Sequence, residues 1–175
     1  MKRILALLSL LLFSTLALAQ TKNPVTTVLR EIMPRQQSNL VAAAEEMPAD
    51  KYGFQPTPAQ MTFGHLVVHM VKSNLELCAK AGDAAPPPRV GDARETDSKE
   101  KLVSALKTSF DFCSTALAHA DDSHLGDNIE MHAGQPVPRA FAYFALTNDW
   151  ADHYSTAAMY LRLNGLLPPT AQAKK

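Results

Sequence analysis

The stretch DWADHYSTAAMYLRLNGLLPP, residues 149–169, predicts the closing helix of a helical protein. Apolar or small residues occur on nearly every side of its helical wheel, which is typical of a helix packed against several others. Gly165 is a preferred residue just after a helix, and the two prolines that follow prevent its continuation. Asp149 and His153 are exceptions in this stretch, because polar side chains in a packed helix need partners or a function.

The composition of the chain fits one helical globular domain. Of its 175 residues, 46% are hydrophobic and 19% are charged, which is enough to form a core. Alanine and leucine are abundant and glycine is scarce, which favours helices over turns. The formal net charge is zero, so the composition does not indicate a nucleic acid or an anionic membrane as a partner.

Residues 1–19 have the pattern of a secretory signal peptide. A basic start precedes an apolar run, which ends in the small-x-small cleavage site Ala17-Leu18-Ala19. The run is shorter than the roughly 20 residues that a membrane span needs, which disfavours the alternative of an uncleaved anchor. We therefore expect an exported single domain of residues 20–175, periplasmic or secreted, with no later membrane span.

Helical periodicity predicts four helices in this domain. The first runs from Pro24 to about Glu46, and Pro34 should kink it or split it. The others are expected over residues 58–80, 98–120 and 137–164. Long connections follow the second and third helices, and alternation around Ile129 and Met131 suggests a short hairpin in the latter. These connections indicate an all-α four-helix bundle with a crossover rather than a simple up-and-down bundle.

Two helices carry candidate metal ligands. Asp149 and His153 are four residues apart, so both side chains leave the same face of the last helix. On the second helix, His65 and His69 lie on one polar stripe. If this stripe faces the last helix, His69, Asp149 and His153 converge as a metal site with open coordination positions. The alternative is a simple Asp149–His153 hydrogen bond, with His69 in solvent.

Two stretches resemble the DinB-like family of four-helix bundles. Residues 47–78, MPADKYGFQPTPAQMTFGHLVVHMVKSNLELC, contain a proline-bearing linker, a Thr-Phe-Gly helix start and a histidine near the middle of the helix. Residues 153–169, HYSTAAMYLRLNGLLPP, are similar to the closing segment of the family. The resemblance implies an up-down-down-up bundle, in which the long crossover makes the second and third helices parallel.

The resemblance also implies a ligand set. His69 matches the family's ligand on the second helix, and His153 matches the second histidine of a pair on the last helix. Family members bind a divalent metal, often zinc or nickel, through three histidines. Asp149 stands where the first histidine of the pair is expected, which implies either a harder site with an altered metal preference or a degenerate site without metal.

Other residues are candidates for a pocket or a disulfide. His65 lies one turn before His69, and Tyr160 continues the row that starts at Asp149, so both are pocket candidates. Their alternatives are a solvent position for His65 and core packing for Tyr160. Cys78 and Cys113 could form one disulfide, as expected of an exported protein, or remain as two buried thiols. The parallel helices implied by the resemblance would place both cysteines at a similar height.

The sequence thus predicts an exported DinB-like protein that binds a divalent metal beside a small-molecule pocket, as a metal-dependent hydrolase or transferase would. Related thiol transferases use cytosolic thiols, which argues against carrying that activity over to an exported protein. One alternative is a non-catalytic accessory or interaction protein with a degenerate metal site. Another is a homodimer in which a neighbouring copy closes the pocket. Fold alone does not decide between them.

Overall fold

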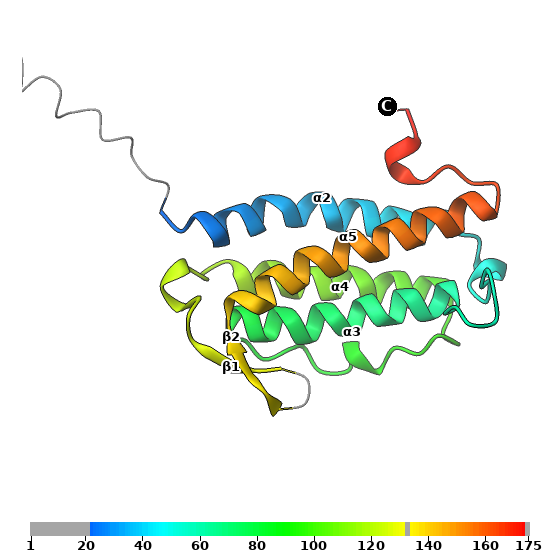
Figure 1. Ribbon diagram of the computed structural model, residues 1–175. Coiled ribbons are helices and arrows are strands. Elements are labelled where there is room, and N and C mark those ends of the chain that lie inside the picture. The colour runs from blue at the N-terminus through cyan, green and yellow to red at the C-terminus, as the bar shows by residue number, and fades with distance from the viewer. Residues whose placement is uncertain (1–21, 132–133, 174–175) are drawn as a thin grey trace, which may run out of the picture.

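The computed structural model describes residues 22–131 and 134–173, and the predicted signal peptide lies outside these ranges. Within them the chain folds as the predicted all-α bundle of four long helices (Figure 1). The helices are α2 (Pro24–Glu46), α3 (Phe63–Gly82), α4 (Lys99–Leu117) and α5 (Ala140–Leu163). None of the described helices is long and apolar enough to cross a membrane.

Helices α3 and α4 run parallel. Asn74 on α3 contacts Ser109 on α4, and one turn later a disulfide joins Cys78 to Cys113. Both pairs are separated by 35 residues, and a constant separation is the mark of parallel helices. Residues 83–98 therefore cross back along the bundle before α4 begins, as Figure 1 shows.

The other helices run in the opposite direction. Tyr143, near the start of α5, donates its hydroxyl hydrogen to the carbonyl of Ala81 near the end of α3. Arg30, in the first half of α2, donates to the carbonyl of Leu117 at the end of α4. Helices α2 and α5 are thus antiparallel to α3 and α4, and the order of directions is up-down-down-up.

A short antiparallel hairpin precedes α5. Strand β1 (Asn128–Glu130) pairs with strand β2 (Pro136–Pro138), and Ile129 lies opposite Val137. The alternation around Ile129 predicted this hairpin. Ile129 is buried against the bundle, which places Met131 beside the start of α5.

The predicted start of one helix is wrong, and one of the two effects expected of Pro34, a split, does not occur. Helix α3 begins at Phe63 instead of residue 58, because the hydroxyl of Thr62 accepts a hydrogen bond from the backbone N–H of His65 at 3.0 Å and caps the helix there. Pro34 does not split α2, which is helical without interruption. Pro34 has no N–H group, so the backbone carbonyl four residues earlier loses its helical hydrogen bond. Because Pro34 is exposed, water can donate to that carbonyl instead.

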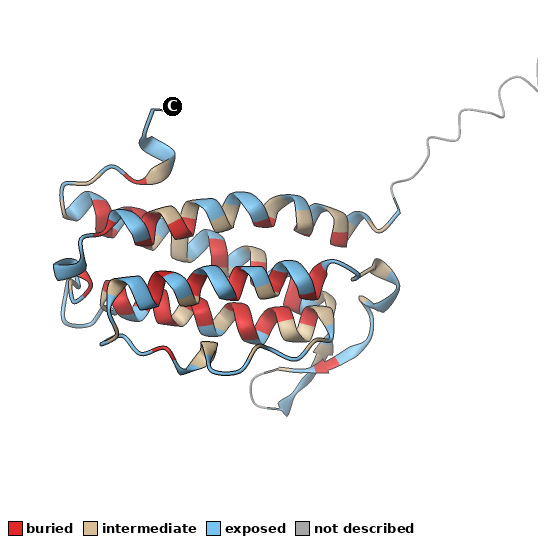
Figure 2. Cartoon of the chain, turned by 180° about the vertical axis from the view of Figure 1, so that it is seen from behind, coloured by how far each residue is buried: buried red, intermediate tan, exposed pale blue. Residues whose placement is uncertain are grey.

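Buried apolar residues recur along the inward faces of all four helices (Figure 2). The largest fully buried side chains include Trp150, Tyr160, Phe63, Phe110, Leu40 and Met47. Burying a large apolar side chain contributes about 1.5–3 kcal/mol, so this shared core supplies most of the driving force for the bundle. Its apolar contacts are not directional, and polar contacts are needed to set the exact alignment of the helices.

A chain of buried hydrogen bonds provides this alignment. The indole N–H of Trp150 donates to Asn74 Oδ1 at 2.7 Å, and Asn74 Nδ2 donates to Ser109 Oγ at 2.9 Å. The hydroxyl of Ser109 in turn donates to the carbonyl of Leu106 at 2.8 Å. Asn74, Ser109 and Trp150 are all fully buried. Because a buried donor without a partner is costly, these bonds hold α3, α4 and α5 in one register.

We expect Asn74→Leu to lower the free energy of unfolding by about 1–3 kcal/mol, because the buried indole N–H of Trp150 loses its acceptor. Urea denaturation followed by circular dichroism measures this change. Asn148→Leu is the matched control, since Asn148 is exposed on α5, and its effect should stay within about 0.5 kcal/mol. Equal effects of the two substitutions would contradict the role given to Asn74.

The start of α2 is capped by a residue that is distant in the sequence but lies at the same end of the bundle. Asp122 accepts hydrogen bonds from the backbone N–H groups of Val25 and Thr26, each at 2.9 Å. Removal of the Asp122 carboxyl from water would raise its pKa, but the hydrogen bonds from Thr26 and Val25 outweigh this effect and hold the pKa below its ordinary value. Asp122 thus ties the segment after α4 to the first helix.

Asp122→Ala should lower stability at neutral pH, and the loss should disappear in acid. The folded pKa of Asp122 is depressed, so its contribution is complete above the unfolded pKa of about 3.9 and is lost as pH falls through the folded value. Urea denaturation of both proteins between about pH 7 and about pH 3 measures the difference. A difference that is constant over this range would contradict the assignment.

Candidate metal centre

The part of the α3 polar stripe that starts at His69 lines an open cleft of about 920 Å³. His69, Lys72 and Glu76 belong to this stripe, and all three line the cleft. The facing wall comes from α5, and Met131, which follows β1, also lines the cleft. The stripe therefore faces α5, which is the arrangement that a metal site requires. The α5 residues that line the cleft are Phe141, Phe144, Ala145, Thr147, Asn148, Asp149, Asp152 and His153.

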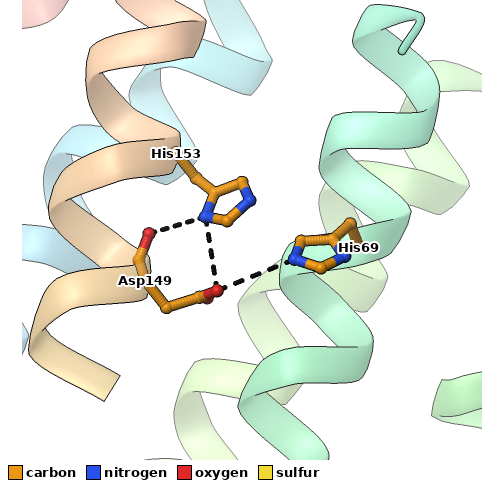
Figure 3. A group of neighbouring side chains, drawn as sticks. All are labelled: His69, Asp149 and His153. Atoms are coloured by element: carbon orange, nitrogen blue, oxygen red, sulfur yellow. Dashed lines mark hydrogen bonds and ion pairs between the residues drawn. The ribbon is translucent and has the colours of Figure 1, made fainter. Parts of the chain in front are cut away.

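The carboxylate of Asp149 approaches both histidines (Figure 3). Its Oδ1 is 3.6 Å from His69 Nε2 and 3.4 Å from His153 Nδ1. The two imidazole rings stack, with centroids 4.5 Å apart and an angle of 30° between their planes. One ligand atom from each residue lies within 4.8 Å of the others, a group of the kind that can hold a metal ion. The three side chains thus converge.

The Asp149–His153 hydrogen bond differs from the simple side-chain pair that was the alternative. His153 Nδ1 is 2.7 Å from the backbone carbonyl oxygen of Asp149, closer than it is to the carboxylate. A carbonyl only accepts, so Nδ1 is assigned the hydrogen, and in the neutral ring Nε2 then keeps its lone pair. This tautomer is the one in which His153 Nε2 can bind a metal while its ring is held in place.

One oxygen of the Asp149 carboxylate has no hydrogen-bond donor among the described residues. Its side chain is 17% exposed, and its Oδ2 atom is buried with no hydrogen-bond partner among the described residues. The hydroxyl of Ser73 is 3.5 Å from the other oxygen and 3.3 Å from His69 Nε2. A buried carboxylate oxygen without a donor is unfavourable unless a cation neutralises it. The donor set and this oxygen therefore fit a divalent metal.

The structure places His65 and Tyr160 outside the cleft. His65 is exposed, and its Nδ1 lies 3.1 Å from the carboxylate of Glu95, so it ties the crossover segment to the start of α3. Tyr160 is fully buried and donates its hydroxyl hydrogen to the carbonyl of Met61 at 2.9 Å. Burial also raises the pKa of the Tyr160 hydroxyl. Neither residue lines the cleft. His65 has the solvent position that was its alternative, and Tyr160 packs in the core.

Ser73 and two phenylalanines of α5 line the cleft but were not predicted from the sequence as site residues. Ser73 lies four residues after His69, and this spacing alone could have placed it beside the site. Phe141 and Phe144, three residues apart on α5, are 50% and 66% exposed at the cleft. Their spacing resembles that of an ordinary core face, and only the packed structure shows that they are not covered.

Comparisons with known proteins agree with this fold. A family model described as the DinB superfamily matches residues 33–157. A DinB-like protein from Bacillus cereus has a TM-score of 0.67 at 14% identity, over 81% of this chain and 93% of that one. A DinB-like protein from Bacillus subtilis has a TM-score of 0.64 at 19% identity, over 83% and 99%.

A conserved protein from Enterococcus faecalis is also similar, with a TM-score of 0.64 at 16% identity over 79% of this chain and 95% of that one. At these identities the structural likeness concerns the fold alone. Among curated proteins, none matches this chain. The family model spans well over half of the sequence, including His69, Asp149 and His153, and the chain therefore belongs to the DinB superfamily.

Proposed function

We propose that this chain is an exported DinB-superfamily protein that binds a divalent metal ion through His69, Asp149 and His153. The observation that carries the proposal is the convergence of two imidazoles and a carboxylate within 4.8 Å, with one carboxylate oxygen buried and without a partner. Two histidines and one carboxylate are a common set of three protein ligands in catalytic metal sites. Such sites leave a position for water or substrate.

Each residue has a distinct task in the proposed site. His69 and His153 supply imidazole nitrogens, and Asp149 supplies a carboxylate oxygen and a negative charge. The backbone carbonyl of Asp149 holds the His153 ring through its Nδ1–H, which keeps Nε2 free. When bound, the ion supplies Lewis-acid chemistry or lowers the pKa of a water molecule.

The cleft beside these residues suits a small molecule with a polar and an apolar part. Phe141 and Phe144 offer exposed phenyl rings, and Lys72 places a positive charge on the opposite wall. The polar part would lie at the three ligands and the apolar part against the rings. A metal-dependent hydrolase or transferase acting on such a molecule is the activity that this arrangement supports best.

Two features support export. Residues 1–19 have the signal-peptide pattern, and Cys78 and Cys113 form a disulfide. Disulfides persist mainly in oxidising compartments such as the periplasm and the extracellular space.

A second candidate function is that of a non-catalytic interaction protein. The first turns of α2 and α5 border an apolar groove of about 330 Å³, where Val28 and Phe144 are half exposed or more. Exposed apolar surface of this kind is often an interaction site. A protein with this role alone would not need to bind metal, so metal binding distinguishes the two candidates.

We expect the apoprotein to bind one zinc or nickel ion per chain in isothermal titration. His69→Ala and His153→Ala should each weaken binding by more than about 100-fold, because a ligand is lost outright rather than a supporting contact. His65→Ala is the matched control: it removes an exposed histidine one turn away on the same helix and should leave the affinity unchanged. Binding that survives both ligand substitutions would contradict the site.

Ser73→Ala should weaken metal binding by about tenfold, the lower end of the effect of removing a group that orients a ligand. With His69 Nε2 bound to the ion, the Ser73 hydroxyl is left to donate to Asp149 alone. Ser73→Thr keeps the hydroxyl and should retain most of the affinity. Unchanged or tighter binding by Ser73→Ala, measured by the same titration, would show that Ser73 does not support Asp149.

A further inference from the structure

The groove between α2 and α5 is lined almost entirely by apolar side chains. The two helices lie side by side (Figure 1), and the groove between their first halves has a volume of about 330 Å³. Val28 is 51% exposed and Phe144 is 66% exposed, so apolar surface in this groove is open to solvent and suits an apolar occupant. The apolar lining consists of Pro24, Val25, Val28, Leu29, Ile32 and Phe144.

The polar side chains of the groove are already engaged within the protein. Among the described residues that line it, Tyr143 and Thr147 carry hydroxyl groups. The Tyr143 hydroxyl donates to the carbonyl of Ala81 at 3.1 Å, and the Thr147 hydroxyl donates to the carbonyl of Phe144 at 3.0 Å. A peptide segment in the groove would need partners for its backbone N–H and C=O groups, whereas a hydrocarbon chain needs none. The lining therefore favours a hydrocarbon chain.

The groove adjoins the cleft of the candidate metal centre. Phe144 and Thr147 line both the groove and the cleft. Phe141, one turn before Phe144 on α5, adds a half-exposed ring on the cleft side. An occupant of the groove can therefore extend past the Phe144 ring toward the three candidate ligands. A molecule with a polar head and an apolar chain suits the two adjoining spaces together.

We propose that the α2–α5 groove binds the hydrocarbon chain of an amphiphilic molecule whose polar head lies in the cleft at His69, Asp149 and His153. The position of the head rests on the proposed function, and the groove adds the class of molecule, an acyl compound with a straight chain. An oxygen atom of the head would complete the coordination of the bound ion. The chain would lie along α2 between Val25 and Ile32, a length of about 10 Å.

Straight-chain alkanoates from butanoate to dodecanoate test the groove, since they share one carboxylate head and differ only in chain length. They are titrated calorimetrically into the zinc-loaded protein, below the concentrations at which they form micelles. We expect the affinity to rise about two- to fourfold per added methylene, because a fully buried methylene contributes about fourfold. The rise should stop once the chain is longer than the groove. An affinity that does not change with chain length would overturn the inference.

Val28→Asp places a charge in the groove and should abolish the gain in affinity with chain length. The affinities for zinc and for butanoate should stay unchanged, because Val28 does not line the cleft. Met159→Asp is the matched control: Met159 is 46% exposed on α5 and lies outside the groove, so this variant should keep the gain. Phe144→Ala, a second variant, should reduce the gain by removing the ring that the chain passes. An equal gain in Val28→Asp and Met159→Asp would overturn the inference.

The same experiments separate this inference from the proposed function. A protein that binds no zinc would refute the proposed function, and the alkanoate series on the metal-free protein would then test the groove by itself. Zinc binding without an effect of chain length would refute the groove alone. Sedimentation velocity tests the other occupant: a wild-type dimer that Val28→Asp converts to a monomer would show that a second copy fills the groove, which would also overturn the inference.

Discussion

The arrangement of the candidate site depends on the buried hydrogen bond between Trp150 and Asn74. Asp149 directly precedes Trp150 and Ser73 directly precedes Asn74, so the bond that aligns α3 with α5 also brings Asp149 to the Ser73 hydroxyl and His69. The Asn74 amide continues to Ser109, and the disulfide one turn later joins the same two helices covalently. Polar contacts in the core thus set the positions that apolar packing alone would leave free to slide.

Local patterns in the sequence predicted much of this fold, because helical periodicity and caps depend on neighbouring residues. They predicted the four helices, the hairpin at Ile129 and the polar stripe that carries His69. The cap of α2 could not be predicted in this way, since Asp122 lies 96 residues from Thr26. Tyr160 shows a further limit. It shares a helical row with Asp149, but eleven residues along a helix are about 16 Å, and at that height the row faces the core.

Asp149 is unfavourable for the stability of the fold but is suited to binding a cation. A carboxylate that is largely removed from water beside two imidazole rings is unfavourable by itself, and one of its oxygens lacks a donor among the described residues. In a degenerate site the same position would be satisfied by hydrogen bonds or would open to water. The hydrogen bond from His153 to the backbone carbonyl and the open cleft beside the three side chains are compatible with the proposed ion.

Anomalous diffraction from a metal-loaded crystal tests the central claim most directly. The account predicts one ion about 2 Å from His69 Nε2, His153 Nε2 and a carboxylate oxygen of Asp149, with its remaining positions facing the cleft. An ion bound elsewhere, for example at the exposed His124–Asp127 pair, together with an empty position between α3 and α5, would contradict it.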